Sequence, residues 1–192
     1  MRSPTNGSSP EHCQHCQPSR NSTPLTVRRL EKKNRRNRRK IGIAEYAVVT
    51  DETVLITSGL GSCLGIVLYD PGKMVSGLIH VMLPTVDQAR DNTPAKFVDT
   101  GLPLLIDEME DAGANPNRLR AWIIGGSEMI QFTSSDESIG SRNITMATQL
   151  IDEYGLRLVD SDVGGNHGRS IQFDPSVGEV SIRTADETTQ TI

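Results

Sequence analysis

A cysteine and a histidine lie on the two sides of a predicted β-hairpin. Cys63 follows a glycine-rich turn, and His80 lies in the second of two apolar runs that flank residues 70–73, DPGK. Proline and glycine at the centre of such a segment are typical of a tight turn. If residues 70 and 73 close the hairpin, Cys63 and His80 lie directly opposite each other, with Cβ atoms roughly 4.5–5.5 Å apart. A slip of one residue in this register would turn one of the two side chains to the other face.

A thiol beside an imidazole can carry out nucleophilic catalysis. The thiolate is the nucleophile, and a neighbouring imidazole can take the thiol proton and later give it to a leaving group. Gly61 and Ser62 precede Cys63, and small residues there let backbone N–H groups approach a substrate carbonyl and stabilise an oxyanion. The alternative is that Cys63 and His80 are ordinary core residues. The spacing alone favours that alternative, because cysteine is among the most buried residue types.

Several sequence motifs favour a functional site over ordinary core packing. The segment TSGLGSC (residues 57–63), the YDP turn and the segment LIHVMLP (residues 78–84) together resemble the signature of the chemoreceptor glutamine deamidase family, CheD. Further motifs of that family follow in the same order: KFVDT (96–100), GGSEM (125–129), IGSRN (139–143) and VGGN (163–166). The resemblance covers about residues 41–184. Several motifs in the right order are much more specific than one cysteine–histidine pair.

The resemblance implies hydrolysis of a side-chain amide on a protein. Enzymes of this family convert glutamines of methyl-accepting chemoreceptors to glutamate, and some act on the methyl esters. Carried over by motif, Cys63 attacks the carboxamide carbon and expels ammonia, and water then hydrolyses the thioester. His80 acts as general base and then as acid, and Thr57 matches the third active-site position, where it orients the imidazole. The resemblance implies neither a metal nor an organic cofactor.

The resemblance also indicates residues around the site and partners. Residues expected to bind the substrate are Gly61, Ser62, Gly125, Gly126, Gly164, Gly165 and Asn166. The alternative for the four later glycines is turn geometry. Expected partners are the chemoreceptors and a CheC-type phosphatase. A non-catalytic adaptor that binds both is the alternative to an enzyme.

Charge divides the chain of 192 residues into two parts. The first 40 residues contain 11 lysines and arginines and two acidic residues, whereas the other 152 contain 9 basic and 22 acidic residues. We expect a disordered basic leader over residues 1–40, unless the leader is an artefact of the choice of start site. One deamidase-like domain over residues 41–184 and a frayed polar tail over 185–192 are expected to follow. The acidic excess of the domain favours a protein from a salt-rich cytoplasm, although an ordinary acidic protein fits equally well.

The leader contains two patterns that are weak signals of binding. Cys13 and Cys16 have the spacing of half a zinc site, but no second ligand pair follows at a suitable distance. Residues 28–40 contain nine basic residues without interleaved aromatic side chains, which favours a solvated basic arm over the alternative of nucleic-acid binding. No apolar stretch approaches the ~18 residues of a membrane span, and the N-terminus lacks the apolar core of a secretory signal. Together with an odd number of cysteines, this predicts a cytoplasmic protein.

Hydrophobic periodicity predicts the elements that position these residues. Strands are predicted over residues 41–49, 54–57, the two hairpin runs, 119–124, 156–160, 169–173 and 179–184. Two helices are predicted, one from Pro94 to Gly113 and one that Asn143 caps and Gly155 ends. Strands in runs with two inserted helices favour an α+β domain with mixed or antiparallel sheets over a doubly wound parallel sheet. The family resemblance implies the same layered α/β sandwich.

Overall fold

The computed structural model describes residues 37–88, 93–128, 137–184 and 188–192. Its strands form two five-stranded sheets. The first sheet has the order β1 (Arg38–Lys40), β3 (Val54–Leu60), β8 (Arg169–Asp174), β9 (Glu179–Thr184) and β10 (Thr189–Thr191). The second has the order β2 (Tyr46–Val49), β5 (Val75–Val81), β4 (Leu64–Asp70), β6 (Arg120–Gly125) and β7 (Arg157–Val163).

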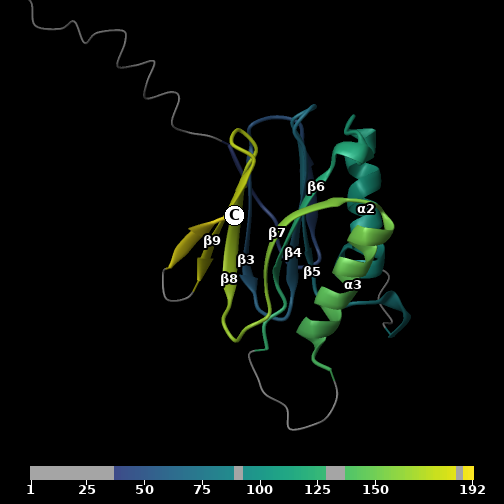
Figure 1. Ribbon diagram of the computed structural model, residues 1–192, viewed down its shortest axis with the longest axis vertical. Helices are drawn as coiled ribbons and strands as arrows, with labels where there is room; N and C mark the ends of the chain where they lie inside the picture. Colours follow the sequence, from purple (N-terminus) through teal and green to yellow (C-terminus); the bar gives the residue numbers. More distant parts are fainter. Residues whose placement is uncertain (1–36, 89–92, 129–136, 185–187) are drawn as a thin grey trace, which may run out of the picture. The chain divides into compact units, whose positions relative to one another are not determined.

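Two helices cover the outer face of the second sheet, so the domain has three layers (Figure 1). They are α2 (Val98–Asp111) and α3 (Ile139–Glu153). Short 3₁₀ turns, η1 (Val86–Gln88), η2 (Pro94–Lys96) and η3 (Pro116–Arg118), connect the elements. Both sheets contain parallel and antiparallel pairs. The predicted α+β sandwich with mixed sheets is therefore confirmed.

The central strands of the second sheet contribute to two hydrophobic cores. In β5, Ile79 and Val81 pack under the helices, whereas Leu78 packs between the two sheets. This alternation follows from the two-residue period of a strand, and a strand covered on both faces is apolar along its whole length. His80 has the same parity as Leu78, so its side chain faces the first sheet.

The two ends of the predicted domain differ from the expectation. Arg38–Lys40, which the charge pattern assigned to the leader, form β1 and pair in parallel with β3. Thr189–Thr191, expected to be frayed, form β10 and pair with β9. Both strands are short, polar and exposed, so neither carries a hydrophobic signal in the sequence. Residues 1–36, including Cys13 and Cys16, lie outside the described residues.

The predicted helix boundaries are partly wrong. Asn143 lies inside α3 and is completely buried, and the helix is capped by Ser138, whose hydroxyl accepts a hydrogen bond from the Ser141 N–H. The predicted first helix is divided into η2 and α2. Asparagine is a common cap, but a serine placed five residues earlier satisfies the helix terminus here.

The hairpin of β4 and β5 has a longer turn than predicted. Asp70 pairs with Val75, so Gly65 lies opposite His80 and Cys63 does not. The Asp70 carboxylate accepts hydrogen bonds from Gly72 N and from the Arg118 guanidinium, which holds the wider loop together. The prediction that Cys63 and His80 are directly opposed is therefore wrong by two residues. A shift of two keeps both side chains on the same face and makes them diagonal neighbours.

Candidate active site

A hydrogen bond between the two sheets places His80. Thr57 of β3 and His80 of β5 face each other across the layers, with 2.8 Å between Thr57 Oγ1 and His80 Nδ1. Thr57 is 2% exposed and His80 is not exposed at all. The contact brings together the third predicted active-site residue and the predicted general base.

The second contact of Thr57 fixes the tautomer of His80. The Thr57 hydroxyl donates to the carbonyl oxygen of Ile41 at 2.8 Å. A hydroxyl has one proton, so Thr57 Oγ1 must accept from His80 Nδ1–H. In the neutral ring the lone pair is then on Nε2, which is buried and has no hydrogen-bond partner among the residues that the structure describes. Burial lowers the pKa of His80 below its ordinary value of 6.5, so the ring is neutral at neutral pH and Nε2 can accept a proton.

Cys63 is a free, partly buried thiol that packs at the margin of the core between the sheets. Burial raises the pKa of the thiol above its ordinary value, and the residue's own backbone N–H opposes the shift only in part. The resting sulfur therefore carries its proton at neutral pH. A thiol in this state needs a base to become a nucleophile, and a base with a free nitrogen stands on the adjacent strand.

The turn that carries Cys63 is held by its carbonyl groups. Gly61 O accepts from Ser127 N, Ser62 O accepts from the side-chain nitrogen of Asn143, and Cys63 O accepts from Gly126 N, each at 2.8 Å. The donors come from the end of β6 and from α3. Within the part of the chain that the structure describes, the N–H groups of Ser62 and Cys63 donate to no backbone carbonyl. Three occupied carbonyls thus accompany two N–H groups that have no backbone acceptor among the described residues.

Gly125 and Gly126 are required by the close approach of this turn. Gly125 has a φ of 118°, and a Cβ there would overlap the carbonyl oxygen of Cys63. Gly126 has a φ of 67°, and a Cβ there would press on Ile144 of α3. The two glycines therefore have a role in backbone geometry, which was the alternative to substrate binding. That geometry positions the Cys63 turn, so the two interpretations are compatible.

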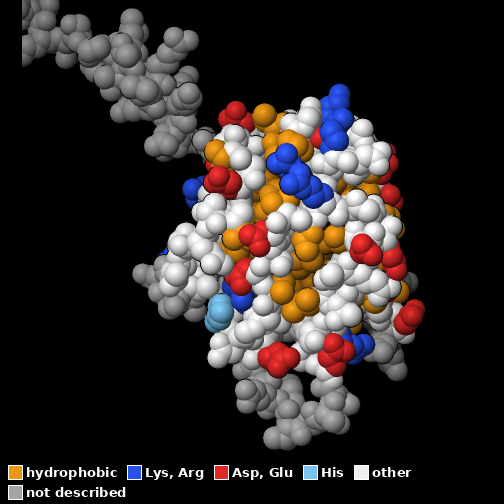
Figure 2. Space-filling model, viewed as in Figure 1, with side chains coloured by type: hydrophobic (Ala, Val, Ile, Leu, Met, Phe, Trp, Pro, Cys, Tyr) orange, Lys and Arg blue, Asp and Glu red, His pale blue; other side chains and the backbone are white. Residues whose placement is uncertain are grey.

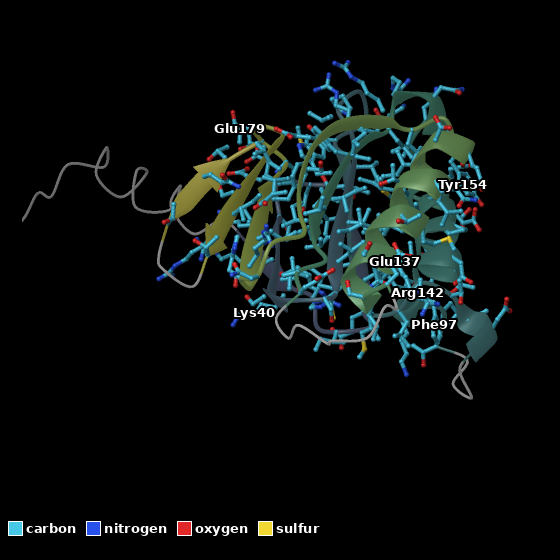
Figure 3. The ribbon with its side chains drawn as sticks, turned by 60° about the horizontal axis from the view of Figure 1, so that its bottom comes forward. Lys40, Phe97, Glu137, Arg142, Tyr154 and Glu179 are labelled. Atoms are coloured by element: carbon cyan, nitrogen blue, oxygen red, sulfur yellow. The ribbon has the colours of Figure 1, made fainter. Side chains whose placement is uncertain are left out.

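A pocket of about 420 Å³ is connected to the Cys63 turn through Gly126, which lines the pocket and donates its N–H to Cys63 O. Its lining residues are Gly126, Glu128, Ser141, Ile144, Thr145, Gly164, Gly165 and Asn166. It therefore brings together Gly126, Gly164, Gly165 and Asn166 of the predicted substrate-binding residues, whereas Gly61, Ser62 and Gly125 lie at the Cys63 turn itself. Figure 3 shows the end of the molecule where the two helices begin, with Phe97 preceding α2 and Glu137 and Arg142 at the start of α3.

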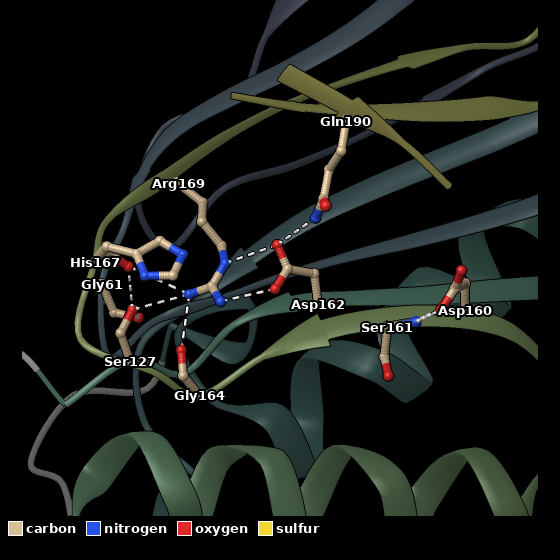
Figure 4. A network of polar contacts seen from close by, with 9 residues as sticks. All are labelled: Gly61, Ser127, Asp160, Ser161, Asp162, Gly164, His167, Arg169 and Gln190. Carbon is tan, nitrogen blue, oxygen red and sulfur yellow. Dashed lines mark hydrogen bonds and ion pairs between the residues drawn. The ribbon is translucent and has the colours of Figure 1, made fainter. Parts of the chain in front are cut away.

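A buried arginine fixes the loop that forms one wall of this pocket (Figure 4). Arg169 is 3% exposed and forms an ion pair with Asp162, with 2.7 Å between the closest atoms. Its remaining guanidinium nitrogen donates to the carbonyls of Gly164 and His167 and to the hydroxyl of Ser127. The Ser127 backbone in turn holds Gly61, so the arginine connects the loop after β7 to the Cys63 turn.

Sequence reasoning missed three residues of this arrangement. Asn143 belongs to a motif of the family but was interpreted as a helix cap, and Arg169 was read only as the first residue of a strand. Ile41, whose carbonyl fixes the hydroxyl of Thr57, gives no signal because a backbone group acts there.

Among the described residues, no group of three or more histidine, cysteine, aspartate or glutamate side chains could hold a metal ion.

The face seen in Figure 2 also carries an apolar area over the edge strand β7. Leu158 and Val159 of this strand are 39% and 42% exposed.

No helix in the described part of the chain is both long enough and apolar enough to cross a membrane.

The sequence matches known proteins over most of its length. A family model described as "CheD chemotactic sensory transduction" matches residues 82–184. A protein of Haloarcula marismortui is 46% identical over 147 residues, which are 77% of this chain and 85% of the relative. A protein of Desulforamulus reducens is 47% identical over 76% of this chain and 89% of its own length, and one of Natronomonas pharaonis is 44% identical over 77% and 88%. Each of the three relatives is described as "Probable chemoreceptor glutamine deamidase CheD".

Proposed function

The chain belongs to the CheD family, and on this basis we propose that it is a chemoreceptor glutamine deamidase. In this proposal Cys63 is the nucleophile, His80 the general base and acid, and Thr57 the residue that orients the imidazole. The observation that carries the proposal is the free, buried Nε2 of His80 on the strand next to the Cys63 turn. Its tautomer is the one that a base at this position needs.

The reaction proceeds through two acyl transfers. His80 Nε2 takes the thiol proton while the Cys63 sulfur attacks the carboxamide carbon of a receptor glutamine, and a carbon–sulfur bond forms. The carbon–nitrogen bond then breaks, and ammonia leaves with the proton that His80 returns. Water, activated by the same nitrogen, attacks the thioester carbon. The carbon–sulfur bond breaks, which leaves a glutamate side chain on the receptor and restores the thiol.

Backbone N–H groups stabilise the charge that develops on the substrate oxygen. The N–H groups of Ser62 and Cys63 are the available donors at the turn, and donors fixed before the reaction are the usual source of such stabilisation. The adjoining pocket then receives the part of the receptor that surrounds the glutamine. We assign Gly126, Gly164, Gly165 and Asn166 to that contact because they line this pocket.

The family membership also supports the location and partners that we propose. We place the protein in the cytoplasm, with chemoreceptors as substrates and a CheC-type phosphatase as a binding partner. The support for the phosphatase is the family resemblance alone, so binding of a purified CheC-type protein is a separate measurement from catalysis.

The decisive experiment is incubation of the purified protein with the cytoplasmic fragment of a chemoreceptor from the same cell. Peptide mass spectrometry then follows conversion of glutamine to glutamate. We expect conversion by the wild type and none by Cys63→Ala or His80→Ala. If folded wild-type protein converts no glutamine, with or without a CheC-type partner, the enzyme is rejected in favour of a non-catalytic adaptor.

A further inference from the structure

The strongest unassigned feature near the site is Asn143 of α3. Its side chain is completely buried, and its amide nitrogen donates one hydrogen bond to Ser62 O at 2.8 Å and another to Met82 O at 2.9 Å. Both acceptors are carbonyl oxygens, so the nitrogen rather than the oxygen of the amide must face them. The orientation of the side chain is therefore fixed by its two partners.

These partners belong to the two segments that carry the reacting groups. Ser62 directly precedes Cys63, and Met82 follows His80 by two residues. Asn143 is thus a single side chain that holds the nucleophile's turn and the end of the base's strand at the same time. The distance between the thiol and the imidazole depends on both segments.

Peptide geometry gives the contact a second consequence. In a planar trans peptide the C=O bond and the following N–H bond point in opposite directions. The bond that fixes Ser62 C=O therefore also fixes the direction of the Cys63 N–H, which points away from Asn143. Occupied carbonyls at Gly61 and Cys63 hold the neighbouring peptides in the same way.

A structural role alone accounts poorly for an asparagine at this position. The side-chain oxygen of Asn143 is buried without a hydrogen-bond partner among the described residues. An unpaired buried carbonyl destabilises the folded state, and an apolar side chain of similar size would avoid that loss. The gain that offsets it is the pair of hydrogen bonds to the two active-site segments.

We propose that Asn143 is a positioning residue that aims the Cys63 N–H at the oxyanion of the acyl-transfer steps. The inference rests on the proposed role of Cys63 as nucleophile. Asn143 touches neither the substrate nor the sulfur in this proposal. It acts through the Ser62–Cys63 peptide.

The test compares two reactions of the same sulfur. Acetylation of Cys63 by p-nitrophenyl acetate forms a carbon–sulfur bond through an oxyanion and releases p-nitrophenolate. Alkylation by iodoacetamide displaces iodide directly and forms no oxyanion. Mass spectrometry of the peptide that contains Cys63 measures both rates, so Cys13 and Cys16 do not contribute.

In Asn143→Ala we expect acetylation to slow by about 10- to 100-fold, less than the loss seen when an oxyanion donor is deleted outright. Alkylation should remain within about twofold of wild type, because the thiol itself is unchanged. The matched control is Gln149→Ala, which removes an exposed side-chain amide from the same helix and should alter neither rate. Thermal unfolding establishes that each variant is folded. If Asn143→Ala does not fold, the same ratio of rates is measured for Asn143→Ser instead.

The ratio of the two rates decides the outcome. A ratio of acetylation to alkylation that stays at the wild-type value, whether both rates fall or neither does, overturns the proposal. The assay needs no chemoreceptor. A lowered ratio in a protein whose wild type fails to deamidate the receptor fragment would therefore reject the proposed function and retain the positioning role.

Discussion

At the scale of single residues, the site depends on one shared hydroxyl. Thr57 donates its proton to Ile41 O and accepts from His80 Nδ1, so one side chain selects both the ring orientation and the nitrogen that is free. The sequence motif placed threonine, cysteine and histidine in the same site without indicating this direction of donation. Only the position of the Ile41 carbonyl decides it.

Replacement of Thr57 by valine tests this role. Thr57→Val keeps the shape of the side chain but removes the acceptor for His80 Nδ1–H, so the ring can present either nitrogen to the thiol. We expect the kcat of deamidation to fall by about 10²-fold or more, within the range that general-base catalysis contributes. Thr57→Ser, which keeps the hydroxyl, should retain most activity. Equal activity of the valine and serine variants would contradict the assignment.

The burial of both reacting groups predicts a wide pH optimum. The proposed mechanism needs a neutral imidazole, and burial lowers the pKa of His80, so activity should fall on the acid side only below pH 6.5. The pKa of the Cys63 thiol is raised above 9.0, so its alkylation by iodoacetamide should still increase as the pH rises through 9. Both profiles are measured on wild-type protein. An alkylation rate that is already flat between about pH 6 and pH 9 would indicate a preformed thiolate and contradict this arrangement.

At the scale of elements, the hairpin that carries His80 is closed by Asp70. Its carboxylate accepts from the Arg118 side chain and from the backbone of Gly72 and Asn115, and the Arg118 hydrogen bonds are the main cause of a pKa of about 2. A lowered pKa adds stability above the ordinary value of 3.8, and this stability is lost as the pH falls through the lowered one.

The variant Asp70→Asn removes the charge and retains the shape. We expect it to lower the free energy of unfolding at pH 7 by about 1–2 kcal/mol, a range reduced for the solvent screening at Arg118. The difference from wild type should shrink as the pH approaches 2, because wild-type Asp70 is then protonated too. Urea denaturation at several pH values measures it. A difference that does not depend on pH would mean that the ion pair is not its source.

The ion pair of Arg169 and Asp162 is expected to stabilise the loop after β7, and Arg169→Ala tests this. Arg169→Ala removes a buried cation and leaves the Gly164 carbonyl without a donor among the described residues. The Asp162 carboxylate loses its ion pair but keeps the hydrogen bond from Gln190, and the His167 carbonyl keeps the one from Ser127. Breaking a buried pair in this way should cost about 3 kcal/mol or more of unfolding free energy. Arg157→Ala, which removes an exposed arginine from β7, is the comparison. A loss below about 1 kcal/mol in Arg169→Ala would show that water replaces the guanidinium.

The elements also show where sequence reasoning succeeds and where it fails. The strands β3 to β6, β8 and β9 follow from their apolar runs and alternation, because burial on one or both faces leaves such a signal, whereas β7 is exposed over most of its length. The hairpin register was wrong because the Asp70 carboxylate closes a wider loop than Pro-Gly suggests, and its partner Arg118 is distant in sequence. Asn143 was missed for the same reason, since its partners Ser62 and Met82 are distant in sequence.

At the scale of the whole molecule, net charge is the property that can be counted directly from the sequence. Residues 41–192 contain 22 acidic and 9 basic side chains, and the mutual repulsion of these charges destabilises the compact state when salt is low. We expect the unfolding midpoint to rise between about 0.1 M and 2 M KCl as the charges are screened. A neutral solute at equal osmolality separates screening from general solute effects. A midpoint that stays flat would reject adaptation to a salt-rich cytoplasm.

The fold class could be predicted from the sequence, but the order of the strands within each sheet could not. Strand β8 lies between β3 and β9, so a strand near the end of the chain completes the sheet that contains Thr57. Such pairings depend on contacts between distant segments, which periodicity does not encode. The polar strands β1 and β10 join the edges of that sheet without any apolar pattern of their own.

The hydrogen bond from His80 to Thr57 also links the proposed catalytic site to the docking of the two sheets. Its two residues belong to different sheets, and each sheet has its own set of strand pairings. A chain with both sheets built but not yet docked therefore has its cysteine and its histidine and still lacks an oriented base. In the proposed mechanism, activity therefore requires both sheets to be formed and docked against each other.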